Sequence, residues 1–252
     1  MTNIIVDFGN FMFTVALPRF IQGLGLTLLM AGCGILIGFA AGILTSTGRS
    51  FGKKVSSTIC ATYIEIIRGI PLIVQILIWR YAFPSIYSAL TQHDIFDDFK
   101  AVFGIEISPS IFAAIIAIGV NSGAYQAEII RAGINALPIG QSEAGLSIGL
   151  HKSQVIRYIL LPQSLRISIP PLINEFVIVI KDTSLALAIG VLELASIAQS
   201  LTSSNPGHIF EIYIINAVIY LIICYTLSTV AKLIEKKLAI AGYGVKSRRP
   251  LL

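Results

Sequence analysis

The sequence predicts an all-α protein that crosses a membrane about five times. Apolar residues make up 55% of the chain and charged residues only 12%, and the mean hydropathy is +0.84. Soluble globular domains carry about 25% charged residues. Long stretches of the chain also contain no charge, and about 20 apolar residues are enough to span the hydrocarbon core of a bilayer. We therefore expect a polytopic helical membrane protein.

Three of the expected spans lie in stretches free of charged residues. They are the gaps between Arg19 and Arg49, between Glu106 and Glu128, and between Glu211 and Lys232. Two further stretches are long enough to span but contain charges: 57–83, and 171–199, whose helix is expected to begin at Pro170. Segment 1–22 lacks the basic start and cleavage site of a signal peptide. We expect it to be extracytoplasmic, with a short interfacial helix broken at Pro18.

The basic residues indicate which side of the membrane is cytoplasmic. With five crossings, one side holds the turn after the first span, segment 131–166 and the C-terminal tail, which together contain most of the 18 Lys and Arg residues. The loop 91–106, on the other side, is acidic. We therefore expect an outside N-terminus, a membrane domain at 23–236 and a basic cytoplasmic tail at 237–252. The net charge of +5 follows from this bias and requires no nucleic-acid partner.

Motifs for catalysis or cofactor binding are absent from the sequence. No G-x-x-x-x-G-K-[ST] phosphate loop occurs, so we expect the chain neither to bind nor to hydrolyse ATP. His93, His151 and His208 are far apart, in expected loops, and no nucleophile motif accompanies them. No disulfide framework is expected either, because the three cysteines lie within or beside expected spans. We expect a transport protein with no cofactor of its own.

Segment 140–166, here called the knuckle, has the polar composition of two short helices joined at a glycine. Ser142 is a good N-cap for the first helix, and Gly149 can take the left-handed conformation that ends it. Ser153 is expected to cap the second helix, which stops at Pro162. Such a segment would stand rigidly off the membrane, and its outer surface would suit the docking of another protein.

The knuckle also carries a spaced pattern of small and apolar residues: Glu143, Ala144, Gly145, Gly149, Ile159, Leu161 and Pro162. This pattern resembles the signature loop of importer-type (type I) ABC permeases, although the position of Gly145 is usually alanine in that family. Segments 63–75, 121–134 and 161–185 resemble the polar amino-acid uptake branch. In the family, the loop is a coupling helix that sits in a groove of a cytoplasmic ATPase and transmits its motion.

The resemblance implies a bacterial inner-membrane subunit of five or six helices that works in a larger assembly. The implied partners are a dimer of ATP-binding subunits, which bind ATP and Mg, a second permease subunit of the same or a sister chain, and an extracytoplasmic solute-binding protein. The implied substrate is an amino acid, and lipid surrounds the spans.

Charged side chains at membrane depth are costly and usually face a bundle interior or a water-filled path. The second, third and fourth expected spans carry them, so these spans should line the pathway. The uncharged first span should be a peripheral or packing helix. The candidate pathway residues are Glu65, Arg68, Gln75, Glu175, Lys181, Asp182, Thr183 and Ser184.

Structural roles compete with the pathway role for these residues. Glu65 and Arg68 are three residues apart, so they would neutralise each other or form a gate beside a kink at Pro71. Lys181 and Asp182 point about 100° apart on a helix, so each needs another partner, in the substrate or in a neighbouring helix. Thr183 and Ser184 would line the path. Gln75 would either line it or form a hydrogen bond to another helix.

Other polar residues are expected to have structural or peripheral roles. Glu128 and Arg131 should form an ion pair that anchors the third span to the knuckle. Segment 121–123 should allow close helix packing. Glu193, nearer the outside, would serve an outer gate or face the binding protein.

The leading hypothesis is therefore the membrane subunit of an ATP-driven amino-acid importer. An ion-coupled carrier or a channel without an ATPase would also explain the buried charges, but it leaves the knuckle without a purpose. A membrane-bound enzyme is a third alternative. Acidic groups outnumber basic ones among the pathway residues, which favours a basic or neutral polar amino acid over an acidic one.

Overall fold

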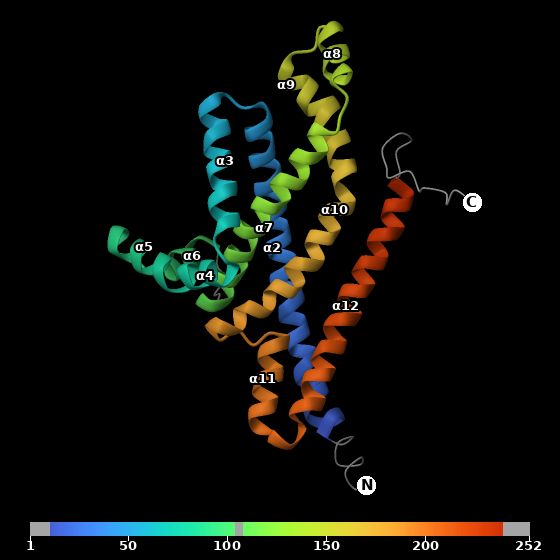
Figure 1. The fold of residues 1–252 in the computed structure, drawn as a ribbon. Coiled ribbons are helices and arrows are strands. Elements are labelled where there is room, and N and C mark those ends of the chain that lie inside the picture. Colours follow the sequence, from blue (N-terminus) through green and yellow to red (C-terminus); the bar gives the residue numbers. More distant parts are fainter. Residues whose placement is uncertain (1–10, 104–107, 239–252) are drawn as a thin grey trace, which may run out of the picture.

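The computed structural model describes residues 11–103 and 108–238, and within them it contains helices and short connections but no strand (Figure 1). In chain order the elements are η1 (Met12–Ala16), α2 (Leu17–Phe51), α3 (Lys54–Gly69), α4 (Leu72–Leu77), η2 (Ile78–Ala82), α5 (Phe83–Thr91), α6 (Ile95–Phe103), α7 (Pro109–Asn135), α8 (Ile139–Ser147), α9 (Lys152–Val155), η3 (Ile156–Leu160), α10 (Leu161–Asp182), η4 (Thr183–Ile189), α11 (Leu194–Ser204), η5 (Pro206–His208) and α12 (Ile209–Leu238). The all-α prediction is confirmed. Most of the predicted basic tail lies outside the described residues.

Among the described residues, three helices are long and apolar enough to cross a membrane: Met12–Phe51, Pro109–Asn135 and Pro206–Ile234. They correspond to the three charge-free stretches of the sequence. The two charged stretches are broken rather than straight. Lys54–Gly69 and Leu72–Thr91 form a pair bent by 102°, and the passage from α10 to α11 is interrupted by η4 and by Gly190 at φ +75°.

Two predicted boundaries of the membrane spans were wrong, both at prolines. Pro18 does not break the chain, because it lies in the first turn of α2, where a missing N–H is tolerated. Pro170 and Pro171 lie inside α10 rather than at its start. Each fits the φ that a helix requires, although each removes one backbone hydrogen bond and its ring crowds the carbonyl of the residue four positions earlier.

The first span is the central packing helix of the bundle and is not peripheral. Its glycines face those of α7: a Cβ atom at Gly38 would lie 3.1 Å from Gly123 N and 3.2 Å from Gly119 O. Gly34 and Gly42 are buried on the same face. Small residues let two helix backbones approach closely in a membrane, so the predicted close packing is confirmed at Gly123, whereas Asn121 lines a cavity described below.

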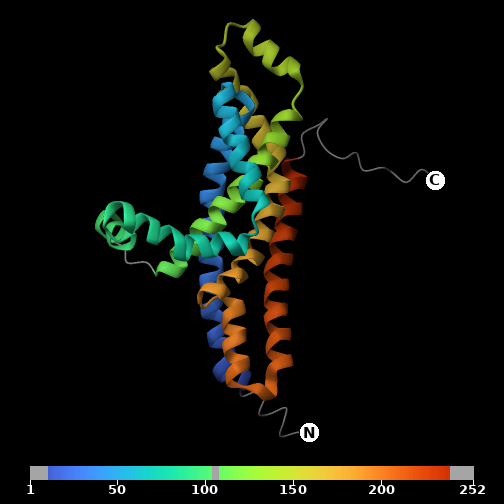
Figure 2. The same ribbon diagram turned by 60° about the vertical axis from the view of Figure 1, so that its left-hand side comes forward.

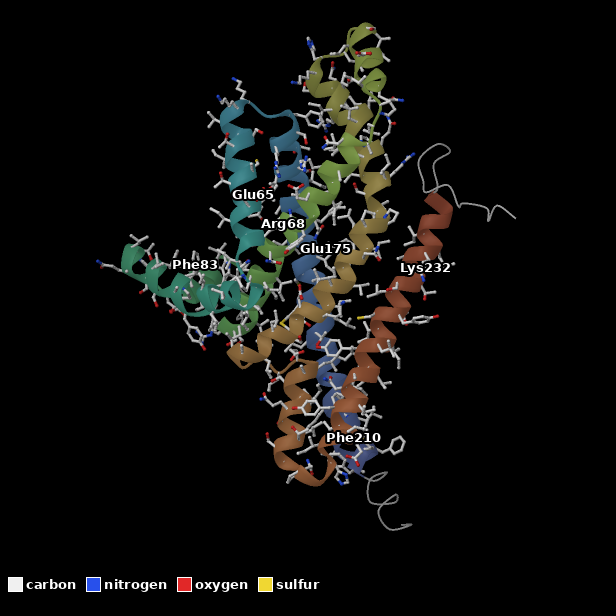
Figure 3. All side chains as sticks on the ribbon, viewed as in Figure 1. Glu65, Arg68, Phe83, Glu175, Phe210 and Lys232 are labelled. Atoms are coloured by element: carbon white, nitrogen blue, oxygen red, sulfur yellow. The ribbon has the colours of Figure 1, made fainter. Side chains whose placement is uncertain are left out.

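The bundle has two ends and a side arm (Figures 1 and 2). The α2–α3 turn, α8, α9 and the C-terminal end of α12 lie at one end, and the N-terminal end of the described chain lies at the other. α4 and α5 leave the bundle sideways from its middle. α12 presents apolar side chains outward, with Phe210 75% and Tyr225 70% exposed, which suits contact with lipid (Figure 3).

A charged cavity and a helical knuckle

A cavity of about 530 Å³ lies inside the bundle, where α3 and α4 meet α7 and α10. Its polar wall includes Arg68 from α3, Asn121 and Tyr125 from α7, and Glu175 and Asp182 from α10. Arg68 and Glu175 are labelled in Figure 3. The two acidic residues are seven positions apart, which is about two helical turns, so they share one face of α10. The cavity therefore combines one basic and two acidic side chains.

The guanidinium of Arg68 lies over the aromatic ring of Tyr125, 5.1 Å from its centroid. This cation–π contact holds the side chain over the cavity and leaves its N–H groups free to bind an anion. Glu65 lies one turn earlier on α3, is exposed, and does not line the cavity. The structure has no ion pair between these two residues, so the predicted self-neutralising pair is not formed.

Glu175 is buried, and its Oε1 atom accepts a hydrogen bond of 3.2 Å from Ser122 Oγ. Asp182 is half-buried at the end of α10. Lys181 is exposed and does not line the cavity. The two neighbours thus point to different surroundings, as their predicted separation around the helix requires.

Thr183 and Ser184 hold the turn that follows α10 and lie outside the cavity. Thr183 Oγ1 donates to the carbonyl oxygen of Ile180 at 2.7 Å, and Ser184 Oγ donates to that of Lys181 at 2.7 Å. Both hydroxyls are therefore used within η4 and the last turn of α10. Their predicted place in the pathway receives no support from the lining of the cavity.

Gln75 braces the bend between α3 and α4. Pro71 interrupts the helical hydrogen bonds there, because it has no N–H to donate. The side-chain Nε2 of Gln75 donates instead to the carbonyl oxygens of Ile67 at 2.8 Å and Ile70 at 2.9 Å. Gln75 is buried behind the bend and does not line the cavity, so it shapes the cavity from outside.

Glu128 joins two helices through a pair of arginines. Arg131 Nη2 lies 2.6 Å from Glu128 Oε2, which confirms the predicted ion pair on α7. Arg49 of α2 binds the other carboxylate oxygen. The anchor therefore fixes α7 to α2, and not to the knuckle as we predicted.

Glu193 is fully buried and caps a helix. Its carboxylate accepts from the backbone N–H groups of Ala195 at 3.0 Å and Ser196 at 2.8 Å, at the start of α11, and from Tyr220 Oη at 2.9 Å. An anionic cap suits the positive end of a helix dipole. The prediction that Glu193 faces a gate or a binding protein was wrong, because the side chain ties α11 to α12.

The knuckle stands at one end of the bundle as α8 and α9 (Figures 1 and 2). The predicted left-handed glycine is confirmed, since Gly149 has φ +85°. The N–H of Gly149 donates to Leu146 O at 3.0 Å, and the N–H of Leu150 donates to Gly145 O at 3.2 Å. These two bonds are the Schellman pattern that ends a helix, and they give α8 a fixed end.

The caps of the knuckle differ from those predicted. α8 begins after Pro138, and Ser142 lies inside it, with its hydroxyl donating to Ile139 O at 2.7 Å. The second helix begins after His151, whose N–H is bound by the side chain of Gln154 at 2.8 Å. Ser153 therefore does not cap it.

The second helix does not stop at Pro162, because α9 continues through η3 into α10. η3 is a wide π-helical turn, and Pro162 follows it in the first turn of α10. The wider turn shifts the hydrogen-bond register, so the proline is accommodated without ending the helix. The knuckle is therefore joined rigidly to the helix that carries Glu175 and Asp182.

Gly145 explains how the two arms of the knuckle pack. A Cβ atom at this buried position would lie 2.8 Å from Ile159 Cδ1 and 2.9 Å from Val155 Cγ2. Glycine therefore lets α8 lie directly against the helix that leads into α10. Glu143, Ala144 and Gly149 are exposed on the outer surface, Leu161 is half-buried and Pro162 is exposed.

The apolar residues on the outer surface of the knuckle were not predicted. Ile148 is 77% exposed and Leu146 52%, and Ile139, which precedes the knuckle as the first residue of α8, is 76% exposed. Exposed apolar surface of this kind is typical of protein–protein and membrane interaction sites. Their interruption of an otherwise polar segment was the signal that could have identified them.

Comparison with known proteins identifies relatives along nearly the whole chain. A family model described as "Binding-protein-dependent transport system inner membrane component" matches residues 34–240. The chain is 36% identical over 225 residues to the glutamine transport system permease protein GlnP of Escherichia coli (strain K12), covering 89% of this chain and 95% of GlnP. It is 38% identical over 221 residues to the L-cystine transport system permease protein TcyB of Bacillus subtilis (strain 168), covering 88% of this chain and 87% of TcyB.

A solved structure shows the same fold. The crystal structure of an amino acid ABC transporter with histidines contains a chain that is 33% identical to this one. The superposition covers 87% of this chain and 94% of that chain, with a TM-score of 0.72.

Proposed function

This chain belongs to the family of binding-protein-dependent transport system inner membrane components, and from that premise we propose that it is the membrane-spanning subunit of an ATP-driven ABC importer for amino acids. One observation supports the proposal most strongly: a single continuous helix connects the charged cavity to the exposed knuckle. That helix runs from Lys152 through η3 and α10 to Asp182. A force applied at the knuckle is thereby transmitted to the wall of the cavity.

The cavity has the charges that an amino acid requires. A zwitterion that leaves water loses the hydration of its carboxylate and of its ammonium, and fixed partners must offset that loss. Arg68 is placed to bind the carboxylate, and Glu175 and Asp182 are placed to bind the ammonium or a cationic side chain. Two acidic groups against one basic group favour a basic or neutral polar amino acid.

The knuckle is the proposed contact with the ATPase. Glu143, Ala144 and Gly149 lie on its outer surface beside the exposed Ile148, and that surface would fill a groove of the partner. ATP and Mg would be bound by this partner, because the sequence of the present chain has no phosphate loop. Ile159, Leu161 and Pro162 would act from within the rigid connection between the knuckle and α10.

The remaining partners follow from the same proposal. A second permease subunit, an ATPase dimer and an extracytoplasmic solute-binding protein would complete the importer. The proposed orientation places the knuckle and the C-terminus in the cytoplasm of a bacterium and the N-terminus outside. The grouping of the basic turn after α2, the knuckle and the end of α12 at one end of the bundle supports this orientation (Figure 1).

Reconstitution tests the function. The chain is purified with an ATPase and a binding protein from the same genome and placed in liposomes. Uptake of labelled glutamine, cystine, histidine and arginine is then measured with and without internal ATP. We expect uptake of at least one of these amino acids to depend on ATP. The control is the same complex with the phosphate-loop lysine of the ATPase replaced, which should abolish uptake.

The alternative of a carrier or channel predicts a different result. Such a protein would transport in the absence of the ATPase and would respond to an imposed ion gradient. Uptake that persists without the ATPase would therefore overturn the proposal, and so would failure of the chain to retain an ATPase subunit during purification.

A further inference from the structure

A chain of buried hydrogen bonds leads from α2 to the cavity. Glu175 is the most buried of the three charged residues in the cavity wall, at 7% exposed. Ser122 Oγ lies 3.2 Å from Glu175 Oε1, and Gln126 Nε2 lies 2.9 Å from Ser122 Oγ. The same amide nitrogen lies 3.4 Å from the carbonyl oxygen of Ile35 on α2. Three helices are thereby connected to one carboxylate.

The chemistry of the groups sets the direction of these bonds. An ionised carboxylate can only accept, so the single hydroxyl proton of Ser122 points to Glu175. The hydroxyl oxygen then accepts from the amide of Gln126. Within the described residues, Ser122 is the one hydrogen-bond donor to Glu175. Oε1 is therefore held by Ser122, whereas Oε2 accepts no hydrogen bond from the described residues and has both lone pairs available to a cation.

The buried amide of Gln126 lowers the stability of the fold at its position. It is fully buried between α2 and α7, and its Oε1 atom has no hydrogen-bond partner among the described residues. A buried amide oxygen without a partner lowers stability. α2 also makes room for this side chain, since a Cβ atom at Gly38 would lie 2.7 Å from Gln126 Nε2. An apolar side chain of similar volume would pack there without the unpaired oxygen, so packing alone does not explain the amide.

We propose that Ser122 and Gln126 are positioning residues that hold one oxygen of Glu175, so that the other faces the cationic group of the substrate. The inference rests on the proposed function of the cavity and adds a residue, Gln126, that does not line it. Without the serine hydroxyl, the carboxylate can rotate about its last torsion and no longer presents a fixed oxygen. The substrate must then order that carboxylate when it binds, and this ordering lowers its affinity.

Substrate binding to the permease–ATPase complex tests the proposal. The binding protein is left out, because its own affinity would dominate the concentration dependence of uptake. The probe is whichever of labelled histidine, arginine, glutamine and cystine the wild-type complex binds most tightly, measured by equilibrium dialysis. Complex yield and the melting temperature are recorded for each variant, so that a loss of folding is separated from a loss of affinity.

Ser122→Ala should raise the Kd by about tenfold, which is the effect of losing a hydrogen bond to a charged group. Ser122→Thr keeps the hydroxyl and should restore the Kd to within about twofold of wild type. The matched control is Ser168→Ala, which removes another buried serine of the α7–α10 interface whose hydroxyl binds the carbonyl oxygen of Ile129 at 3.3 Å. This control should leave the Kd unchanged.

The double variant shows whether the serine acts through the carboxylate. Ser122→Ala combined with Glu175→Gln should bind no more weakly than Glu175→Gln alone, because a positioning residue has no effect once its target is gone. Additive losses would overturn the proposal, as would a wild-type Kd in Ser122→Ala or a failure of Ser122→Thr to restore binding.

Two other results are also decisive. If Ser122→Ala does not assemble, Gln126→Leu makes the same comparison with the hydroxyl in place, and an unchanged Kd overturns the proposal. If the wild-type complex transports none of the four amino acids, the proposed function fails and this inference fails with it. A wild type that binds and transports, with variants that bind equally well, removes only the positioning role.

Discussion

Replacing Gly38 by alanine places a methyl group at the closest approach of α2 and α7. A Cβ atom there would lie 2.7 Å from Gln126 Nε2, 3.1 Å from Gly123 N and 3.2 Å from Gly119 O. Two of these neighbours are backbone atoms that cannot rotate away, so the two helices must move apart. Gly32 offers a matched control on the same helix, because a Cβ atom there meets no atom within 4 Å.

Two opposing effects set the expected change in stability. Alanine favours a helix over glycine by about 1 kcal/mol, and this gain applies at both positions. Overpacking a close interface costs about 1–3 kcal/mol, and this cost applies only at Gly38. Gly38→Ala should therefore be less stable than Gly32→Ala by about 2 kcal/mol. In a chain of 252 residues, that difference lowers the Tm by about 4–8 °C.

The assay is thermal unfolding of both purified variants in the same detergent, followed by the far-ultraviolet circular dichroism of the helices. The wild-type protein should melt below Gly32→Ala and above Gly38→Ala. A Gly38→Ala variant that melts at or above Gly32→Ala would refute the reasoning, because the α2–α7 contact would then have room for a methyl group.

Three further predictions concern orientation, coupling and the substrate. Cysteines introduced at Lys152 and at Ser204, in a background without the native cysteines, should react with a membrane-impermeant reagent from opposite sides, Lys152→Cys from the cytoplasm. Gly145→Leu should at least halve substrate-stimulated ATP hydrolysis, because a Cβ atom there would lie 2.8 Å from Ile159 Cδ1 in η3. Gly140→Ala should not lower it, because a Cβ atom at Gly140 meets no atom within 4 Å. Asp182→Asn should lower uptake by about tenfold with the complex still assembled, since a neutral amide binds a cation less strongly than a carboxylate does.

Each of these predictions has a result that contradicts it. Labelling of both cysteines from the same side would exclude the proposed orientation. Equal ATP hydrolysis in the two glycine variants would place the ATPase on another surface. Loss of the assembled complex in Asp182→Asn would show that the carboxylate pairs with a neighbouring helix and not with substrate.

The class of protein and the place of the knuckle could be predicted because they depend on local properties. Hydropathy over about 20 residues identifies a span whatever the neighbouring helices do. The left-handed turn at Gly149 depends on the backbone freedom of a single residue. Helix boundaries were less predictable. The helix ends predicted at Ser142, Ser153 and Pro162 were wrong, because other residues cap these helices and a π-helical turn carries the chain past the proline.

The candidate site was predicted only in part. Of the eight candidate pathway residues, Arg68, Glu175 and Asp182 line the cavity. The other five lie outside it. Ser122, which binds Glu175, and Gln126, which binds Ser122, have roles that the sequence did not assign. A charge at membrane depth indicates that some partner exists, but it does not indicate whether that partner is a helix cap, as for Glu193, or a cavity.

By itself the sequence determined that the chain spans a membrane and that a rigid polar knuckle interrupts its spans, because composition and backbone preference act within a few residues. Only the tertiary structure decided which charges meet. The bend of 102° after α3, held by Gln75, places the start of α4 beside Arg68 in the lining of the cavity that Glu175 also lines. Ser122 of α7 contacts Glu175 of α10, and Gln126 is connected to that carboxylate only through Ser122. Both depend on contacts between residues far apart in the chain, and helical periodicity carries no information about such distances.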